Sequence, residues 1–205
     1  MIIRIICVII GYFIGCIQSA FIVGKFMKVD LREHGSGNLG STNALRVLGK
    51  KAGLITFISD IMKSILSYIL CRLIFGNNIG AIAGIYGCSG AVLGHNFPFY
   101  LNFKGGKGIA VMVGMILSLS MLNYKVAIIS FAIGTIGLLT KYVSLGSILF
   151  SIAIPFSLYI LGFENEYIIV CIVLGLLAIY KHKSNIKRLI NGTESKVDFS
   201  KKIKK

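Results

Sequence analysis

The chain has 205 residues, of which 56% are hydrophobic and 14% are charged, and its formal net charge is +15. Soluble domains carry roughly 25% charged residues, so this composition excludes an ordinary soluble domain and indicates an integral membrane protein. We expect the positive charge to follow from membrane topology, with lipid as the neighbour of the chain and without bound nucleic acid.

Seven apolar runs follow one another along the chain, and each predicts a transmembrane helix. The first run, at 5–24, has no charge and is long enough to cross the hydrocarbon core of a bilayer. It exceeds the apolar region of a signal peptide, so we expect it to be retained. The other six runs lie at 52–75, 79–97, 109–122, 126–140, 145–162 and 166–180. The predicted fold class is therefore an all-α integral membrane protein, a single domain over 1–205 with a basic cytoplasmic tail at 183–205.

Lysine and arginine determine the expected orientation of these seven helices. With the N-terminus outside and the C-terminus in the cytoplasm, eighteen of the 22 Lys and Arg residues lie in cytoplasmic segments. Joining the runs at 109–122 and 126–140 would give six helices instead. That arrangement would bury Lys125 at a cost of about 2.5–3.5 kcal/mol and would export the basic tail. Seven helices are preferred.

A glycine-rich polar segment at 34–46, the first polar segment, separates the first two runs. Its glycines allow backbone amides to turn towards one point, as in an anion-binding nest. Ser41, Thr42 or Asn43 is expected to cap a short helix that carries Arg46 one turn later. An ordinary flexible loop is the alternative that residue types leave open. The candidate residues are Ser36, Gly37, Asn38, Gly40, Thr42, Asn43 and Arg46.

Two ionisable residues, Asp60 and Lys63, lie one helical turn apart inside the second run. Charges at that depth normally pair and face the interior of the bundle. We expect them to support the structure, with a role in fixing the site as the alternative.

The second polar segment, 94–108, leads directly into an apolar helix. Glycines and two lysines before a helix start favour phosphate. The segment is not a Walker A loop, because Leu101 and Gly108 stand where that motif needs Gly and Ser or Thr. The aromatic run from Phe97 is expected at the lipid interface. The candidate residues are His95, Lys104, Gly105, Gly106, Lys107 and Gly108.

The third polar segment, 182–194, is expected to continue the last helix, which would put His182 and Asn185 one turn apart on the same side. Histidine can orient or deprotonate a hydroxyl group, although a lone interfacial histidine is more often only a polar surface residue. None of the three histidines has the spacing of a zinc motif, so we expect no metal.

Together these segments resemble the signature motifs of the bacterial acyl-phosphate-dependent glycerol-3-phosphate acyltransferases, the PlsY family. The resemblance covers the whole chain, in order and spacing. It rests on Ser36-Gly-Asn-x-Gly-x-Thr-Asn43 with Arg46, Gly94-His-x-Phe-Pro98 with Phe103-Lys-Gly-Gly-Lys-Gly108, Lys141-Tyr-Val-Ser-Leu-Gly146, and His182-x-x-Asn-Ile-Lys-Arg-Leu-Ile-x-Gly-Thr-Glu194. Two positions depart from the family pattern, namely Leu39 and Ser64, and neither lies in the expected chemistry.

The resemblance implies a cytoplasm-facing enzyme of the bacterial inner membrane. It implies transfer of a fatty acyl group from acyl phosphate to the 1-hydroxyl of glycerol 3-phosphate, without a cofactor, giving lysophosphatidic acid and phosphate. By motif match, Ser36 and the first-segment glycines bind phosphate, Arg46 is essential, and Lys107 with Gly105, Gly106 and Gly108 holds a phosphate. Ser144, His182 and Asn185 position the glycerol end, and Glu194 supports the local structure. The oligomeric state stays open, with a monomer as the working expectation.

The residues themselves are compatible with direct transfer, because acyl phosphate is already activated. The base is either His182 or a phosphate oxygen of the substrate. An acyl-CoA enzyme with an H-x4-D motif is disfavoured, since Leu39, Tyr100 and Lys187 follow the histidines at that spacing. A transporter of an anionic phosphorylated metabolite is the alternative function, although no inverted repeat is evident.

Overall fold

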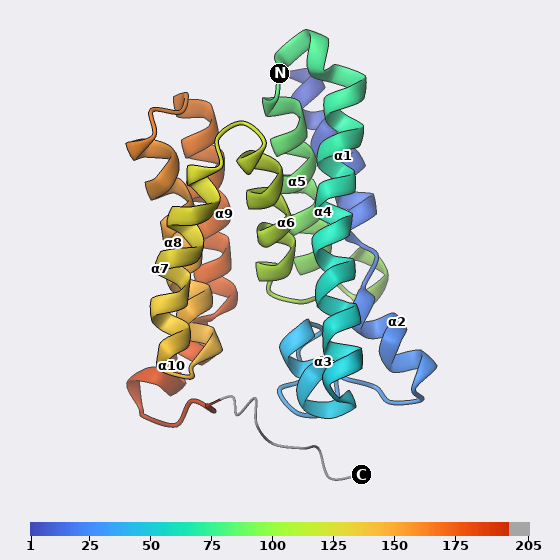
Figure 1. Ribbon diagram of the computed structural model, residues 1–205. Coiled ribbons are helices and arrows are strands. Elements are labelled where there is room, and N and C mark those ends of the chain that lie inside the picture. The colour runs from blue at the N-terminus through green and yellow to red at the C-terminus, as the bar shows by residue number, and fades with distance from the viewer. Residues whose placement is uncertain (197–205) are drawn as a thin grey trace. The chain divides into compact units, whose positions relative to one another are not determined.

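The computed structural model describes residues 1–196, and every regular element in that range is helical (Figure 1). This confirms the all-helical fold class. The part of the predicted basic tail beyond residue 196 lies outside the described residues. The helices are α1 (Ile2–Gly15), α2 (Ser19–Phe26), α3 (Ser41–Leu48), α4 (Lys50–Ile79), α5 (Ile82–Asn96), the 3-10 helix η1 (Phe99–Leu101), α6 (Ile109–Ser120), α7 (Lys125–Leu139), α8 (Val143–Ile160), α9 (Asn165–Lys181) and α10 (Lys183–Ile190).

The chain divides into two compact units. The first unit, Met1–Ser118, contains α1 to α5, η1 and most of α6, and the second unit begins at Leu119 and contains α7 to α10. The first and second polar segments belong to the first unit. Ser144 and the third polar segment belong to the second.

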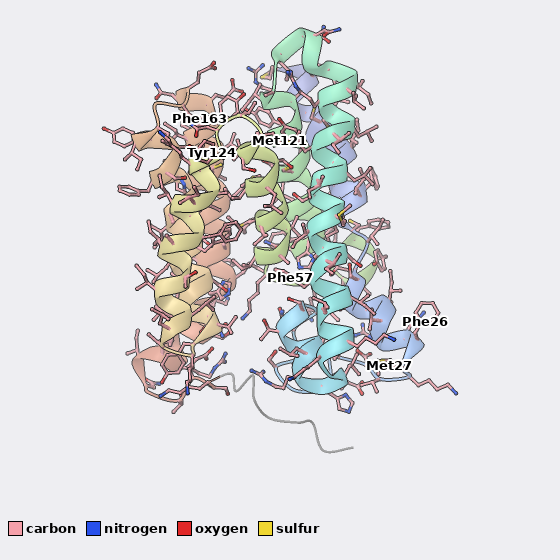
Figure 2. The ribbon with its side chains drawn as sticks, in the orientation of Figure 1. Phe26, Met27, Phe57, Met121, Tyr124 and Phe163 are labelled. Carbon is pink, nitrogen blue, oxygen red and sulfur yellow. The ribbon has the colours of Figure 1, made fainter. Side chains whose placement is uncertain are left out.

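Each of the seven predicted runs is helical over most of its length, but the helices differ in their ability to cross a membrane. Three are long and apolar enough, namely residues 2–26, α4 and α8, and α9 with α10 makes a fourth if that bent pair is one span. The helices α6 and α7 are apolar but shorter. Large apolar side chains are exposed on the helices, among them Phe26 and Met27 at the end of α2 and Phe57 on α4, which are labelled in Figure 2. Such a surface suits lipid. The crossing number of seven and the orientation stay predictions.

Close backbone approach joins α1 to α5 in the first unit. A Cβ atom on Gly11 would lie 1.9 Å from the carbonyl oxygen of Gly87, and one on Gly90 would lie 2.1 Å from that of Val8. Small residues allow this contact, which is the common packing solution between membrane helices. It brings the end of α1 against the end of α5, where the second polar segment begins.

The first predicted helix is broken at 16–18, which corrects the expectation of one helix over 5–24. The break frees backbone carbonyls, and in a membrane these need partners from within the protein. The Tyr100 hydroxyl donates to the Cys16 carbonyl at 2.8 Å, and Lys63 Nζ donates to the Ile17 carbonyl at 2.9 Å. Gln18 Nε2 donates to the His95 carbonyl at 3.1 Å. The break is therefore held by side chains far away in the sequence.

The second unit contains a bend at its C-terminal end. The axes of α9 and α10 differ by 59°, with His182 at the break. The expectation that the third polar segment continues the last helix is therefore wrong, and residues 183–190 of the predicted tail form a separate short helix. In the same unit α7 and α8 approach closely, since a Cβ atom on Gly137 would lie 2.5 Å from Gly146 Cα.

Candidate active site

The first polar segment forms a loop held together by the side chain of Asn43. Its Oδ1 accepts the Ser36 amide at 2.9 Å, and its Nδ2 donates to the carbonyls of Leu31 and His34, both at 3.1 Å. Asn43 is 2% exposed, so these contacts lie inside the protein. Because Asn43 stands one turn before Arg46 on α3, the loop that carries exposed Ser36 lies against the helix that carries exposed Arg46.

The glycines of this loop shape the backbone. Gly35 and Gly37 have φ values of +64° and +69°, which only glycine adopts without strain. The amides of Gly37 and Gly40 donate to carbonyls two or three residues back in the chain, and that of Ser36 donates to Asn43. These three amides therefore close the loop, whereas the sequence alone suggested a nest of amides turned towards a ligand.

Helix α3 begins one residue earlier than the predicted caps. Gly40 is its N-cap, without a capping side chain, and Ser41 and Thr42 fill the first helical turn. The expected capping by Ser41, Thr42 or Asn43 is therefore wrong, because Asn43 folds back to the preceding loop instead. The Asn43 amide donates to the Gly40 carbonyl at 3.1 Å, whereas the amides of Ser41 and Thr42, the first two of the helix, have no acceptor within it. This end of α3 can therefore still accept an anion.

The second polar segment lies against the last residues of α5. The Gly105 amide donates to the Asn96 carbonyl at 3.2 Å, and the Gly106 amide donates to the His95 carbonyl at 3.1 Å. These two amides, expected to hold phosphate, are thus engaged within the protein. Lys104 is exposed and Lys107 is half-buried.

Gly106 is where the first and second polar segments meet. A Cβ atom on Gly106 would lie 2.6 Å from the Leu39 carbonyl oxygen and 2.1 Å from His95 Nε2. Leu39 and Leu101 also share one buried apolar cluster. The structure therefore brings together the loop of Ser36 and the loop of Lys107, which the sequence places about 70 residues apart.

Asp60 and Lys63 form the ion pair that their spacing indicates, at 2.8 Å, with side chains 1% and 5% exposed. Lys63 Nζ also contacts His95 Nδ1 at 2.8 Å, and Ser19 Oγ donates to Asp60 Oδ1 at 2.9 Å. His95 is 3% exposed. Sequence reasoning placed His95 among the phosphate-binding residues and missed its contact with Lys63.

In the second unit, the carboxylate of Glu194 collects three hydrogen bonds. Oε1 accepts from Ser144 Oγ at 2.7 Å and from Asn185 Nδ2 at 2.6 Å, and Oε2 accepts from Arg188 Nε at 2.7 Å. Burial works to raise the pKa of Glu194, but these bonds outweigh burial and lower the pKa below its ordinary value. An ionised Glu194 therefore ties the start of α8 to α10. The part played by Arg188 was not predicted.

His182 lies at the break between α9 and α10 and is 4% exposed. Its Nδ1 lies 2.8 Å from the Ala178 carbonyl oxygen. A carbonyl only accepts hydrogen bonds, so Nδ1 carries the proton, and in the neutral ring Nε2 is then an acceptor. This tautomer suits a general base that takes a proton through Nε2.

Within residues 1–196, no group of three or more His, Cys, Asp and Glu side chains is arranged to hold a metal ion. The candidate residues offer cations, amides, hydroxyl groups and histidine. These groups suit anionic substrates.

Comparison with known proteins gives one consistent result. A family model described as glycerol-3-phosphate acyltransferase matches residues 5–192. A glycerol-3-phosphate acyltransferase of Thermoanaerobacter pseudethanolicus is 45% identical over 96% of each chain, and one of Alkaliphilus metalliredigens is 46% identical over 95% of this chain and 96% of its own.

Solved structures agree with these sequence matches. A crystal structure of PlsY (YgiH), an integral membrane glycerol 3-phosphate acyltransferase, in its glycerol 3-phosphate form has a TM-score of 0.84 and 35% identity. The match covers 95% of this chain and 96% of the PlsY chain. The lysophosphatidic acid form of the same protein has a TM-score of 0.82 and 34% identity, with 95% of each chain covered.

Proposed function

Since the chain belongs to the glycerol-3-phosphate acyltransferase family, PlsY, and is an integral membrane protein, we propose that it transfers a fatty acyl group from acyl phosphate to the 1-hydroxyl of glycerol 3-phosphate. The products are lysophosphatidic acid and inorganic phosphate. The acceptor and the product are supported by the two forms in which the similar PlsY was crystallised. In this proposal seven helices cross the cytoplasmic membrane of a bacterium, with the N-terminus outside and the reaction on the cytoplasmic side.

The contact between the first and second polar segments at Gly106 is the observation that carries the proposal. It brings the first polar segment, which carries Ser36 and Arg46, against the second, which carries Lys107, and these residues supply a hydroxyl group and two cations. Both substrates carry phosphate, so such a group suits them. We assign Arg46 and Lys107 to the two phosphates and Ser36 to one of them, with amides at the starts of α3 and α6 as further donors.

The remaining first-segment and second-segment candidates have supporting parts in this proposal. Asn43 holds the Ser36 loop through the three hydrogen bonds already described. Gly108 has a φ of +84°, which lets the chain enter α6 directly after Lys107. Further contacts to phosphate are assigned to Asn38, Thr42 and Lys104. Gly37 and Gly40, whose amides donate within the loop, are assigned to shaping it.

Residues of the second unit are assigned to the glycerol end of the acceptor. Ser144 and Asn185 are both bonded to Glu194, which fixes their side chains. His182 Nε2 is the proposed acceptor of the hydroxyl proton, and a phosphate oxygen of the substrate is the alternative.

The proposed reaction is a direct transfer. The 1-hydroxyl oxygen attacks the acyl carbon, its proton passes to the base, the bond from the acyl carbon to the phosphate oxygen breaks, and phosphate leaves with the bonding pair. Phosphate is a good leaving group, so no covalent enzyme intermediate is required. Holding two anions in attack geometry supplies up to about 7–11 kcal/mol of the barrier reduction. Cations and amides near the developing charge supply more.

Phosphate release by purified protein in detergent tests the proposal. We expect release from acyl phosphate only when glycerol 3-phosphate is present, and we expect Arg46→Ala to abolish it. Arg32→Ala is the matched control, because Arg32 is an exposed arginine of the same region that pairs with Asp30.

Two outcomes would reject parts of the proposal. Transfer from acyl-CoA without transfer from acyl phosphate would reject the donor. Uptake of glycerol 3-phosphate into proteoliposomes without acyl transfer would indicate the transporter instead.

A further inference from the structure

A buried lysine inside the transmembrane part of the first unit has a complete set of hydrogen-bond partners. Lys63 Nζ contacts Asp60 Oδ1 at 2.8 Å, the Ile17 carbonyl at 2.9 Å and His95 Nδ1 at 2.8 Å. An ammonium group has three hydrogens to donate, so these three acceptors use all of them. Buried charged residues in a membrane protein normally have a functional role. The three acceptors fix the Lys63 ammonium group in a single orientation.

The orientation of Lys63 determines the state of the His95 ring. Ammonium is a donor without an acceptor, so His95 Nδ1 must accept, and the ring proton is on Nε2. The histidine backbone is held as well, because Gln18 Nε2 donates to the His95 carbonyl at 3.1 Å. The ring of His95 is thus held by Lys63 and its main chain by Gln18.

The other face of His95 meets the second polar segment. Its Nε2 lies 2.1 Å from the position that a Cβ atom on Gly106 would occupy, and its carbonyl accepts the Gly106 amide at 3.1 Å. The ring therefore lies directly against Gly106 Cα, where only hydrogen fits. Lys107 is the next residue along the chain.

We infer that Asp60 and Lys63 act through His95 to hold the Gly105–Gly106 backbone in place, and so to position Lys107. We name Asp60, Lys63 and His95 the buried relay. In it His95 is a positioning residue, whereas the sequence alone placed it among the phosphate ligands. The role of Lys107 in binding phosphate rests on the proposed function. The contact by which His95 holds the Gly105–Gly106 backbone does not.

The ring proton of His95 provides a test in the unaltered protein. Nitrogen NMR of protein labelled with ¹⁵N-histidine distinguishes the two tautomers, and the chain has three histidines. We expect His95 to carry its proton on Nε2. His34 and His182 are internal references, because their Nδ1 atoms face backbone carbonyls and must carry the proton in the neutral ring. A proton on Nδ1 of His95 would contradict the proposed relay, and this test requires no variant.

A double variant, Asp60→Leu with Lys63→Met, tests the hold on the loop. Replacing a buried ion pair by apolar residues of similar size is often neutral for folding, whereas breaking it singly is not. We expect hydrogen exchange of the Gly105 and Gly106 amides to become faster by about tenfold or more, while the third polar segment keeps its rate. Lys51→Met is the matched control, because Lys51 is an exposed lysine of the same helix. If the double variant does not fold, the tautomer in the unaltered protein decides.

Kinetics of the double variant then connect the relay to the reaction. A displacement of about 1 Å can cost about a hundredfold, so we expect kcat/KM to fall by about tenfold to a hundredfold. The KM of the substrate whose phosphate Lys107 holds should rise more than the KM of the other. Unchanged exchange and unchanged kinetics would overturn the relay. Faster exchange with unchanged kinetics would leave the relay intact and remove Lys107 from the proposed function.

Discussion

At the scale of single residues, Asn43 and Glu194 have the same kind of task in the two units. Each side chain gathers hydrogen bonds from parts of the chain that would otherwise move independently. Asn43 fixes the loop of Ser36, and Glu194 fixes Ser144 and Asn185. The candidate substrate ligands therefore depend on a second set of polar residues behind them.

Glu194 gives a prediction about pH. Its pKa lies below the ordinary value of 4.5, because hydrogen bonds from Asn185, Ser144 and Arg188 outweigh burial. A carboxyl group with a depressed folded pKa stabilises the protein above its unfolded pKa, and this is lost as the pH falls through the folded pKa. We expect Glu194→Gln to destabilise the protein at pH 7 by about 2 kcal/mol.

Thermal unfolding followed by circular dichroism measures this effect, since the chain has no tryptophan. The difference in Tm between wild type and Glu194→Gln should shrink as the pH falls below 4.5. Glu33→Gln, at an exposed carboxylate, controls for the change in charge. A Tm difference that stays constant as the pH falls from 7 to well below 4.5 would contradict this account of Glu194.

At the scale of helices, the positions of the apolar helices were predictable, but two interruptions were not. Hydrophobic length is a local property, so each run could be found from its own residues. The break at 16–18 depends instead on Tyr100 and Lys63, which lie more than 40 residues away. Gln18 and Ser19, polar residues within the first run, were the available signal. The bend at His182 gave no comparable signal in the sequence.

The helix break predicts the effect of removing one hydroxyl group. The Tyr100 hydroxyl donates to the Cys16 carbonyl at 2.8 Å, and without it that carbonyl loses its donor. An unsatisfied buried acceptor costs about 1–3 kcal/mol, so Tyr100→Phe should lower the free energy of unfolding by that amount. Tyr159→Phe is the control, because Tyr159 is 72% exposed. Equal Tm values for the two variants would show that the break does not depend on Tyr100.

At the scale of the whole molecule, the sequence names candidate site residues but not the contacts that hold them. The motifs single out Ser36, Arg46, Lys107, His182 and Asn185 as candidates, because motif spacing can be found without knowledge of the fold. The contact of Gly106 with Leu39 and the bond from Lys63 to His95 required the fold, since each joins residues more than 30 positions apart. Membrane topology belongs to this scale as well, and charge counting alone supports it.

The proposed reaction requires that the three polar segments face one aqueous compartment, the cytoplasm. Single cysteines at Ser36, Lys104 and Ser184, all exposed positions, can be tested with a membrane-impermeant maleimide in whole cells. The five native cysteines are buried and so are shielded from the reagent. A fourth variant, Glu164→Cys in the predicted outer loop, serves as the outside reference.

We predict that Glu164→Cys reacts in intact cells and that the other three react only after the membrane is permeabilised. Reaction of Ser36→Cys, Lys104→Cys or Ser184→Cys in intact cells would contradict the account.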